Sequence, residues 1–179
     1  MYIKFKLLSL TLLLNTSIFS SVLDEFYWLL TQTLPNYNVS QSKLNNKNEV
    51  YHGMSWEATP LFIAFFPNRF VSRYSFLKVQ PVDRMSGGLE FFTQSSYYPS
   101  DNENNFWLHQ AGARFFIPLI AQGEVLGLKV GGSYSYLNQK NGYSLEAGFY
   151  FYYSLFDITL QYHFNIDSQF TASFNLRYF

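Results

Sequence analysis

The sequence predicts an all-β protein: an eight-stranded antiparallel transmembrane β-barrel, preceded by a short N-terminal amphipathic helix. Three observations lead to this prediction. Successive segments between residues 84 and 179 alternate apolar and polar side chains, which is the period of a β-strand. Charged residues make up 13% of the chain and aromatic residues 21%, whereas an ordinary soluble domain has roughly 25% charged residues. The first 21 residues have the features of an export signal.

Residues 1–21 are expected to form a cleaved signal peptide. Two lysines precede an apolar stretch at residues 7–19, close to the usual length of about 7–15 residues, and Ser20 and Ser21 provide small residues for cleavage. A retained membrane anchor is the alternative. A spanning helix needs about 20 apolar residues, and the polar residues 15–17 interrupt this stretch, so we expect export with cleavage.

Residues 22–48 are expected to form a periplasmic helix followed by a polar linker. Residues 22–34 have the spacing of an amphipathic helix, with Asp24 and Glu25 in its first turn and a proline directly after it. Such a helix would lie at a membrane interface or cap the barrel mouth, and a poorly ordered leader is the alternative. Residues 35–48 are polar and rich in asparagine, a composition typical of linkers.

The barrel is expected to occupy residues 49–179. Residues 49–83 are expected to provide two strands, a third runs from residue 84 to about Tyr98, and five more follow between Trp107 and Phe179. Polar loops and tight turns alternate between these strands. This alternation is typical of outer-membrane barrels, which have short periplasmic turns and longer extracellular loops. The polar loops are residues 99–105, 138–142 and 165–168, and the tight turns are residues 121–123 and 154–155.

The polar face of these strands is expected to point into the barrel and the apolar face outward to lipid, which is the reverse of a soluble barrel. When each hairpin is centred on its loop, Glu90 faces Arg114, and Arg114 faces Lys129. An eight-stranded barrel is just wide enough for side chains to fill it, so we expect a plugged lumen and not an ion pathway. The expected lumen polar network consists of Glu90, Arg114, Lys129, Glu146, Gln161 and His163.

Aromatic residues near the strand ends are expected to form two girdles at the membrane interfaces, where amphipathic rings gather. His109 falls beside Trp107 on the outward face, so we expect an interfacial residue that could meet lipid head groups. The outer girdle consists of Tyr97, Trp107, Tyr136, Tyr143 and Phe170, and the inner girdle consists of Tyr153 and Tyr178.

The last strand, residues 170–179 (FTASFNLRYF), resembles the C-terminal assembly signal of bacterial outer-membrane β-barrels, in which alternating apolar residues precede a terminal aromatic residue. With eight short strands, the chain is similar to small barrels of the OmpX and OmpA-transmembrane-domain type. The resemblance implies an outer-membrane location, contact with outer-membrane lipid and lipopolysaccharide, and insertion by the barrel-assembly machinery. The chain departs from the family in one respect, because Tyr178 and not Phe179 is in phase with the outward residues. The signal residues are Phe170, Phe174, Leu176, Tyr178 and Phe179.

The strongest candidates for chemistry are Ser133, Glu146 and His163, which the same register places level on three neighbouring strands. A serine, an acid and a histidine can form a hydrolase site, and small outer-membrane lipid hydrolases such as lipid A deacylases use such residues. The strand order separates Ser133 from His163 by two strand spacings, about 10 Å, whereas a productive contact needs about 3 Å. We therefore expect a non-enzymatic protein with a structural or surface-interaction role, and a lipid-modifying hydrolase is the first alternative.

A secreted soluble β-barrel that binds an apolar ligand is the second alternative, and it predicts the opposite direction of the side chains. It would bury the apolar residues Leu128, Phe149 and Leu160 and expose the interleaved polar residues Lys129, Glu146 and Gln161.

Composition excludes several other functions. The chain has no cysteine, which excludes disulfides and thiolate metal sites. Its three histidines are scattered and lack the spacing of a metal site, so no metal and no cofactor is expected. Twelve basic residues balance twelve acidic residues, so the chain has no net field that would attract nucleic acid.

Overall fold

The computed structural model describes residues 35–44, 47–77, 79–99, 105–137, 139–166 and 168–176. The expected signal peptide, the expected helix at residues 22–34 and the last two residues of the assembly signal, Tyr178 and Phe179, lie outside these ranges. Within the described ranges, no helix is both long enough and apolar enough to cross a lipid bilayer.

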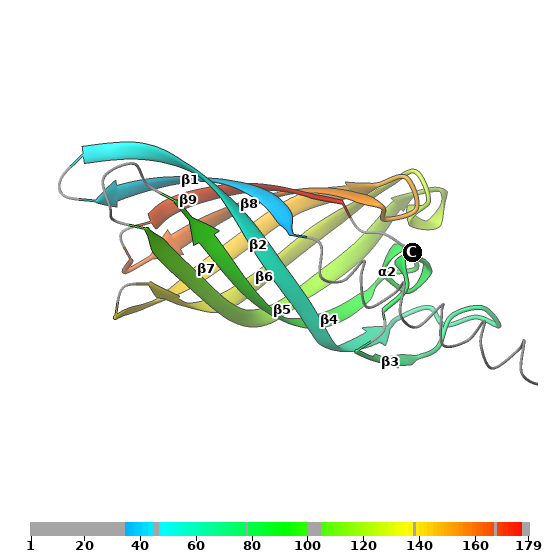
Figure 1. Cartoon of the computed structure of the whole chain (residues 1–179). Helices are drawn as coiled ribbons and strands as arrows, with labels where there is room; N and C mark the ends of the chain where they lie inside the picture. Colours follow the sequence, from blue (N-terminus) through cyan, green and yellow to red (C-terminus); the bar gives the residue numbers. More distant parts are fainter. Residues whose placement is uncertain are drawn as a thin grey trace, which may run out of the picture.

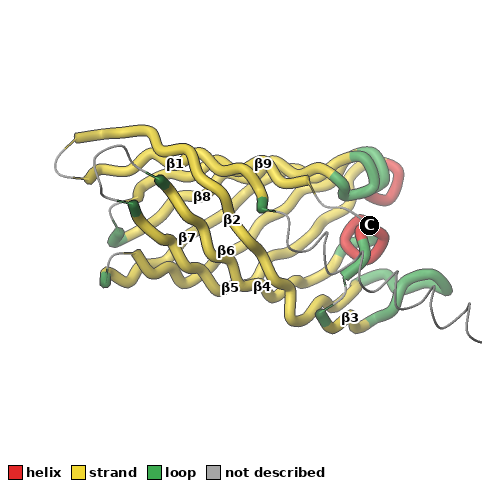
Figure 2. Tube along the Cα trace, in the orientation of Figure 1, coloured by secondary structure: helices red, strands yellow, loops and turns green. Residues whose placement is uncertain are grey.

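Eight antiparallel strands close into a barrel, as Figures 1 and 2 show. The order around the ring is β1, β9, β8, β7, β6, β5, β4 and β2, and pairing of β1 with β2 closes it. The predicted all-β class and the predicted number of barrel strands are therefore confirmed. The strands are β1 (Asn36–Leu44), β2 (Lys47–Ala64), β4 (Gly88–Tyr98), β5 (Phe106–Ile120), β6 (Leu126–Leu137), β7 (Lys140–Phe151), β8 (Phe156–Phe164) and β9 (Ser168–Leu176).

The connections between strands define two ends of the barrel. The longest connection, residues 65–87, joins β2 to β4 at the end where β5–β6 and β7–β8 are also joined, so the expected strict alternation of long loops and short turns is wrong. We call this end the turn end and the opposite end the loop end. The 65–87 segment contains β3 (Tyr74–Phe76), which pairs with β2, and the short helix α2 (Pro81–Met85) at the barrel end (Figure 1).

The first barrel strand lies where the sequence predicted a linker, so that prediction is wrong for residues 36–44. In β1 the small polar side chains of Asn38 and Ser40 are buried, whereas the side chain of Tyr37, directly before Asn38, is exposed. Because the interior of this barrel accepts polar side chains, an asparagine-rich composition does not distinguish an inward-facing strand from a linker. The expectation of two barrel strands within residues 49–83 is also wrong. Only β2 enters the barrel there, and a register shift between Ala58 and Leu61 accommodates the proline inside it.

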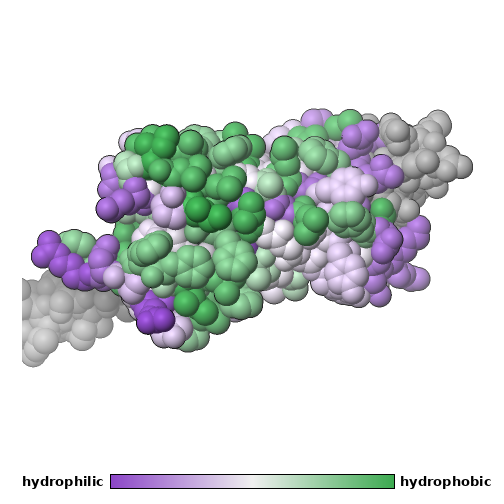
Figure 3. Space-filling view, turned by 180° about the vertical axis from the view of Figure 1, so that it is seen from behind, coloured by the Kyte–Doolittle hydropathy of each residue, from purple (hydrophilic) through white to green (hydrophobic). Residues whose placement is uncertain are grey.

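The direction of the side chains in the barrel wall is opposite to that of a soluble barrel. Leu145 and Phe149 in β7 are 60% and 51% exposed, whereas Glu146 between them is 5% exposed. Leu160 is exposed, and Lys129 and Gln161 are buried. Figure 3 shows apolar side chains covering much of one face of the wall, most densely toward the turn end. The side-chain directions that the soluble-barrel alternative predicted for Phe149, Leu160, Lys129, Glu146 and Gln161 are therefore wrong.

Two apolar clusters lie inside the barrel, one near each end, with polar side chains between them. Inward-facing glycines make room for their large rings. A Cβ atom built on Gly127 would lie 1.9 Å from Cζ of Tyr150, and one built on Gly53 would lie 2.5 Å from Cδ1 of Tyr98. The loop-end cluster is Tyr51, Tyr98, Phe106, Leu108, Leu137 and Ile166. The turn-end cluster is Phe62, Ala64, Val71, Val79, Phe116 and Tyr150, with Val82 and Met85 packed against it.

Candidate functional site

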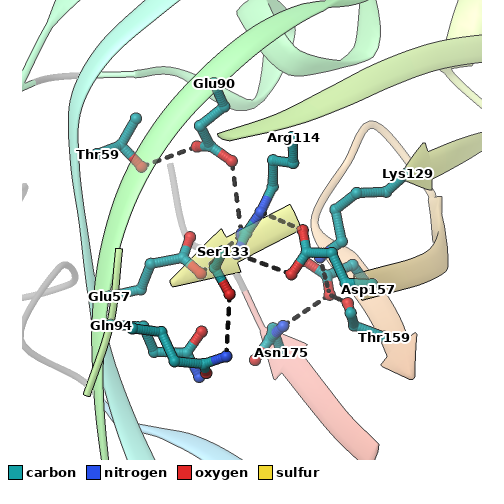
Figure 4. Close-up of polar contacts among 12 residues, drawn as sticks. Glu57, Thr59, Glu90, Gln94, Arg114, Lys129, Ser133, Asp157, Thr159 and Asn175 are labelled. Atoms are coloured by element: carbon teal, nitrogen blue, oxygen red, sulfur yellow. Dashed lines mark hydrogen bonds and ion pairs between the residues drawn. The ribbon is translucent and has the colours of Figure 1, made fainter. Parts of the chain in front are cut away.

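The most distinctive chemistry of the described residues is a group of ion pairs buried inside the barrel (Figure 4). Arg114 of β5, 1% exposed, lies at its centre. Its Nη1 atom is 2.8 Å from Oε2 of Glu57, and its Nε atom is 2.7 Å from Oε1 of Glu146. The guanidinium carbon lies 3.5 Å from the centre of the Phe92 ring. The cation is thus surrounded by carboxylates from β2 and β7 and by an aromatic face, which is how a buried charge is tolerated.

A second arginine enters the same group from the short helix at the turn end of the barrel. Arg84 of α2 donates from Nη2 and Nε to Oε1 of Glu90 at 2.7 and 2.9 Å. Thr59 donates to the same carboxylate oxygen at 2.8 Å. Glu90 Oε2 also lies 3.6 Å from Nη1 of Arg114. Glu90 therefore joins the 65–87 segment to the central arginine, so the short helix is fastened to the barrel interior by a charge-assisted contact.

A third buried cation, Lys129, forms an ion pair closer to the turn end of the interior. Nζ of Lys129 is 2.9 Å from Oδ1 of Asp157. The same oxygen accepts hydrogen bonds from Thr159 Oγ1 at 2.9 Å and from Asn175 Nδ2 at 2.7 Å. Strands β6, β8 and β9 meet at this carboxylate. Because buried ion pairs need further hydrogen bonds to offset desolvation, this set satisfies the chemical requirement for a stable buried pair.

A chain of hydroxyl groups and one histidine runs around the loop-end side of the ion pairs. Nδ1 of His163 is 2.5 Å from Oγ of Ser144, and Nε2 is 3.0 Å from Oγ1 of Thr171. Ser144 also contacts Ser135, and Thr171 donates to Ser40 at 3.3 Å. Strands β6, β7, β8, β9 and β1 are linked in this way by side chains as well as by their backbones.

The structure places all six residues of the expected lumen network in the barrel interior, but their register differs from the expectation. Glu90 does pair with Arg114, as expected. Arg114 pairs with Gly131 and not with Lys129, because a bulge after Pro118 and the turn at residues 121–125 shift the β5–β6 hairpin. The two cations therefore do not lie directly opposite one another.

The expected level row of Ser133, Glu146 and His163 is wrong. Ser133 pairs with Ser144, which pairs with His163, whereas Glu146 pairs with Gln161. Since Ser133 and His163 lie on strands two apart, their separation is about 10 Å. Ser144 is the serine that contacts the histidine, and the other histidine nitrogen contacts Thr171 and not a carboxylate. Both His163 and Ser144 are 2% exposed, so this pair lies where an acyl substrate has no access.

The outward face carries aromatic residues near the loop end, among them all five residues of the expected outer girdle. Trp107 is 46% exposed and lies 5.0 Å from the ring of Tyr97. The rings of Trp107 and His109 are stacked with centroids 6.0 Å apart, and the ring centroids of His109 and Tyr136 are 6.5 Å apart. Tyr143 and Phe170 are also exposed, and so is Tyr153 of the expected inner girdle. Phe174 of the assembly signal is exposed on the same outward face.

Sequence reasoning missed two members of this outward group. The Trp56 ring is stacked on Trp107 with centroids 6.2 Å apart, and Ser95 Oγ lies 3.0 Å from Nδ1 of His109. Ser95 of β4 lies directly opposite Trp56 of β2 on one side and directly opposite His109 of β5 on the other. Antiparallel pairing of directly opposite residues would have found the Ser95–His109 contact once the Glu90–Arg114 register was known.

Among the described residues, no group of three or more histidine, aspartate or glutamate side chains could hold a metal ion. Comparisons with protein-family models, with curated proteins and with solved structures yield no match to this chain.

Proposed function

We propose that this chain is an outer-membrane β-barrel protein of the small OmpX and OmpA-transmembrane-domain type. Its lumen is plugged by side chains, and its role is structural or surface-interacting and not catalytic. The observation that carries this proposal is the reversed polarity of the wall, with Arg114, Lys129 and Glu146 buried inside and Leu145 and Phe149 exposed outside.

The outward apolar surface supports a location in a lipid bilayer. Soluble monomers rarely expose a contiguous apolar patch larger than a few hundred Å², and here large apolar side chains face outward on every strand from β5 to β9. The shortest barrel strands have 9 residues, and a tilted spanning strand needs about 9–11. Because β1 begins and β9 ends at the turn end, we assign the turn end to the periplasm and the loop end to the outside.

The layered interior supports a plugged lumen. An ion that crossed the barrel would have to pass both apolar clusters and displace the ion pairs of Arg114 between them. Desolvating the ion and breaking those pairs are both costly in a medium of low dielectric constant. The ion pairs thus link the wall strands in the part of the interior between the two apolar clusters.

The outward aromatic group at the loop end supports contact with outer-membrane lipid and lipopolysaccharide. Trp56, Trp107, His109 and Tyr136 form a continuous row of rings across β2, β5 and β6. Tryptophan and tyrosine rings have an apolar body and a polar tip, and they are enriched where acyl chains meet head groups. Insertion of such a barrel requires the barrel-assembly machinery as a partner.

A lipid-modifying hydrolase is the second candidate, and one observation favours it. Ser95 and His109 share a hydrogen bond on the outward face, where acyl chains would lie. The test is release of fatty acid from lipopolysaccharide vesicles by the purified protein. We expect no release above the rate of the Ser95→Ala variant, and release that disappears in that variant would establish the hydrolase instead.

The proposed function is tested by location and by conductance. We expect the chain, produced in a Gram-negative host, to be recovered with the outer membrane and to change its gel mobility when boiled. In planar bilayers it should produce no stepwise ion current. Recovery as a soluble periplasmic protein would overturn the membrane assignment, and stable single-channel currents would overturn the plugged lumen.

A further inference from the structure

An open groove of about 630 Å³ lies at the turn end, between the 65–87 segment and the turn that joins β5 to β6. Its volume is within the range of small-molecule sites, about 300–1,000 Å³. We call it the turn-end groove. Its walls are largely apolar, and its polar side chains are Asn68, Ser86 and Gln122. The apolar wall residues are Phe66, Pro67, Val71, Val82, Met85, Pro118 and Leu119.

The walls of the turn-end groove are held in place by backbone contacts. Ala121, Gln122 and Gly123 all have positive φ angles, of 49°, 54° and 91°. A Cβ atom built on Gly123 would lie 2.1 Å from the carbonyl oxygen of Met85, so the turn backbone touches α2 directly. On the opposite wall, the backbone nitrogen of Phe70 donates to Oδ1 of Asn68 at 2.8 Å. A left-handed backbone conformation costs free energy in residues other than glycine, and such residues concentrate at functional sites.

The turn-end groove is continuous with the outward apolar face of the barrel. Ile117 and Leu119 alternate outward along β5, and Leu119 is itself part of the groove wall. Phe65, at the start of the 65–87 segment, lies with its ring 6.1 Å from that of Phe115. A molecule that covers the outward face can therefore reach into the groove without crossing water.

The segment that forms one wall of the turn-end groove also carries positive charge, because Arg69 follows the wall residue Asn68 and Arg73 lies two residues after the wall residue Val71. Arg69 and Arg73 are exposed, with guanidinium carbons 4.4 Å from the Phe70 ring and 5.9 Å from the Tyr74 ring. Residues 65–82 include no aspartate or glutamate. Arginine binds phosphate oxygens through a planar set of donors, so an apolar groove whose wall segment carries two exposed arginines matches a ligand with an apolar tail and an anionic head.

We propose that the turn-end groove binds an acyl chain of an anionic phospholipid from the leaflet at the turn end, with Arg69 and Arg73 on its phosphate. This inference rests on the proposed membrane location. The ligand class follows from the apolar walls, from their continuity with the lipid-facing surface and from the two cations. A neutral lipid, a second copy of the chain and a peptide are the competing occupants.

The test is native mass spectrometry of the full chain released from nanodiscs of phosphatidylcholine that contain a minor fraction of phosphatidylglycerol. We expect one retained phosphatidylglycerol per chain. Because each basic residue near an anionic surface contributes a factor of roughly five, the Arg69→Gln/Arg73→Gln variant should lose about tenfold to thirtyfold of the preference for phosphatidylglycerol. Leu119→Trp should lower retention of any lipid by filling the groove, and Lys140→Gln, an exposed cation at the loop end, is the matched control and should retain it.

Each other outcome overturns the inference. Equal retention of both lipids would replace the anionic ligand by a neutral one, and an unchanged preference in Arg69→Gln/Arg73→Gln would remove the assigned role of the arginines. A dimer that Leu119→Trp dissociates would assign the turn-end groove to a second copy. A chain that inserts into the discs but retains no lipid overturns this inference alone, whereas a chain that does not insert overturns the proposed function as well.

Discussion

Replacing Arg114 by methionine tests whether the buried ion pairs hold the barrel together. Methionine keeps an apolar side chain against Phe92 but removes the charge. Glu57 loses its contact at 2.8 Å, and Glu146 loses contacts at 2.7 and 3.4 Å while it keeps the hydrogen bond from Gln161 at 3.0 Å. Removing one partner of a buried pair costs about 3–5 kcal/mol, because the remaining charge is no longer compensated. We expect Arg114→Met to lower the free energy of unfolding by this amount.

The assay is urea unfolding of the barrel refolded in lipid vesicles, followed by far-UV circular dichroism and by gel mobility without boiling. The double variant Arg114→Met/Glu146→Gln should recover part of the loss, with a coupling of about 1–3 kcal/mol, because it removes an uncompensated charge. Glu124→Gln, an exposed carboxylate at the turn end, is the matched control and should change stability by at most about 0.5 kcal/mol. A loss for Arg114→Met no larger than the loss for Glu124→Gln would refute the reasoning.

Two further predictions address the packing and the surroundings of the wall. Gly127→Ala should destabilise the barrel by about 1–3 kcal/mol through overpacking, because its methyl group would collide with Cζ of Tyr150 at 1.9 Å. The control Gly132→Ala should be neutral in the same unfolding assay, because the nearest atom to its methyl group lies at 3.5 Å. Leu145→Arg should reduce insertion into vesicles, since a cation at mid-bilayer on the lipid face costs about 2–4 kcal/mol. Glu124→Arg at the turn end should insert normally, and normal insertion of Leu145→Arg would count against a lipid-facing wall.

The sequence predicted the direction of the side chains because a strand has a period of two, so one correctly assigned residue determines the face of its neighbours. It predicted the Glu90–Arg114 pairing because the connection between β4 and β5 is centred on its polar loop. The registers of the next three hairpins differ from the predicted registers. The turns of these hairpins contain residues with positive φ angles, among them Gln122, Gln139 and Tyr152. The geometry of such turns depends on a few backbone angles that cannot be predicted from these residue types. An incorrect prediction for one turn changes the predicted register of the whole hairpin.

The 65–87 segment could not be predicted from periodicity, because its residues belong to three different environments. Ser75 is buried in a short strand, Asp83 caps α2 through Gln80, and Arg84 is buried against Glu90 inside the barrel. A five-residue helix has too few turns to show an amphipathic period. The buried partners of Asp83 and Arg84 are set by tertiary contacts, and nothing in the local sequence distinguishes these charges from solvent-exposed ones.

Arg84 connects the two proposals physically. Its hydrogen bonds to Glu90 and Thr59 fasten α2 to the ion pairs in the barrel, and the neighbouring Met85 contacts the backbone of Gly123 on the far wall of the turn-end groove. The water-excluding clusters at the two ends lower the local dielectric constant, which strengthens the ion pairs that remain satisfied inside. In the two proposals taken together, the plugged interior is thus also the rigid support that holds the turn-end groove open beside the lipid-facing wall.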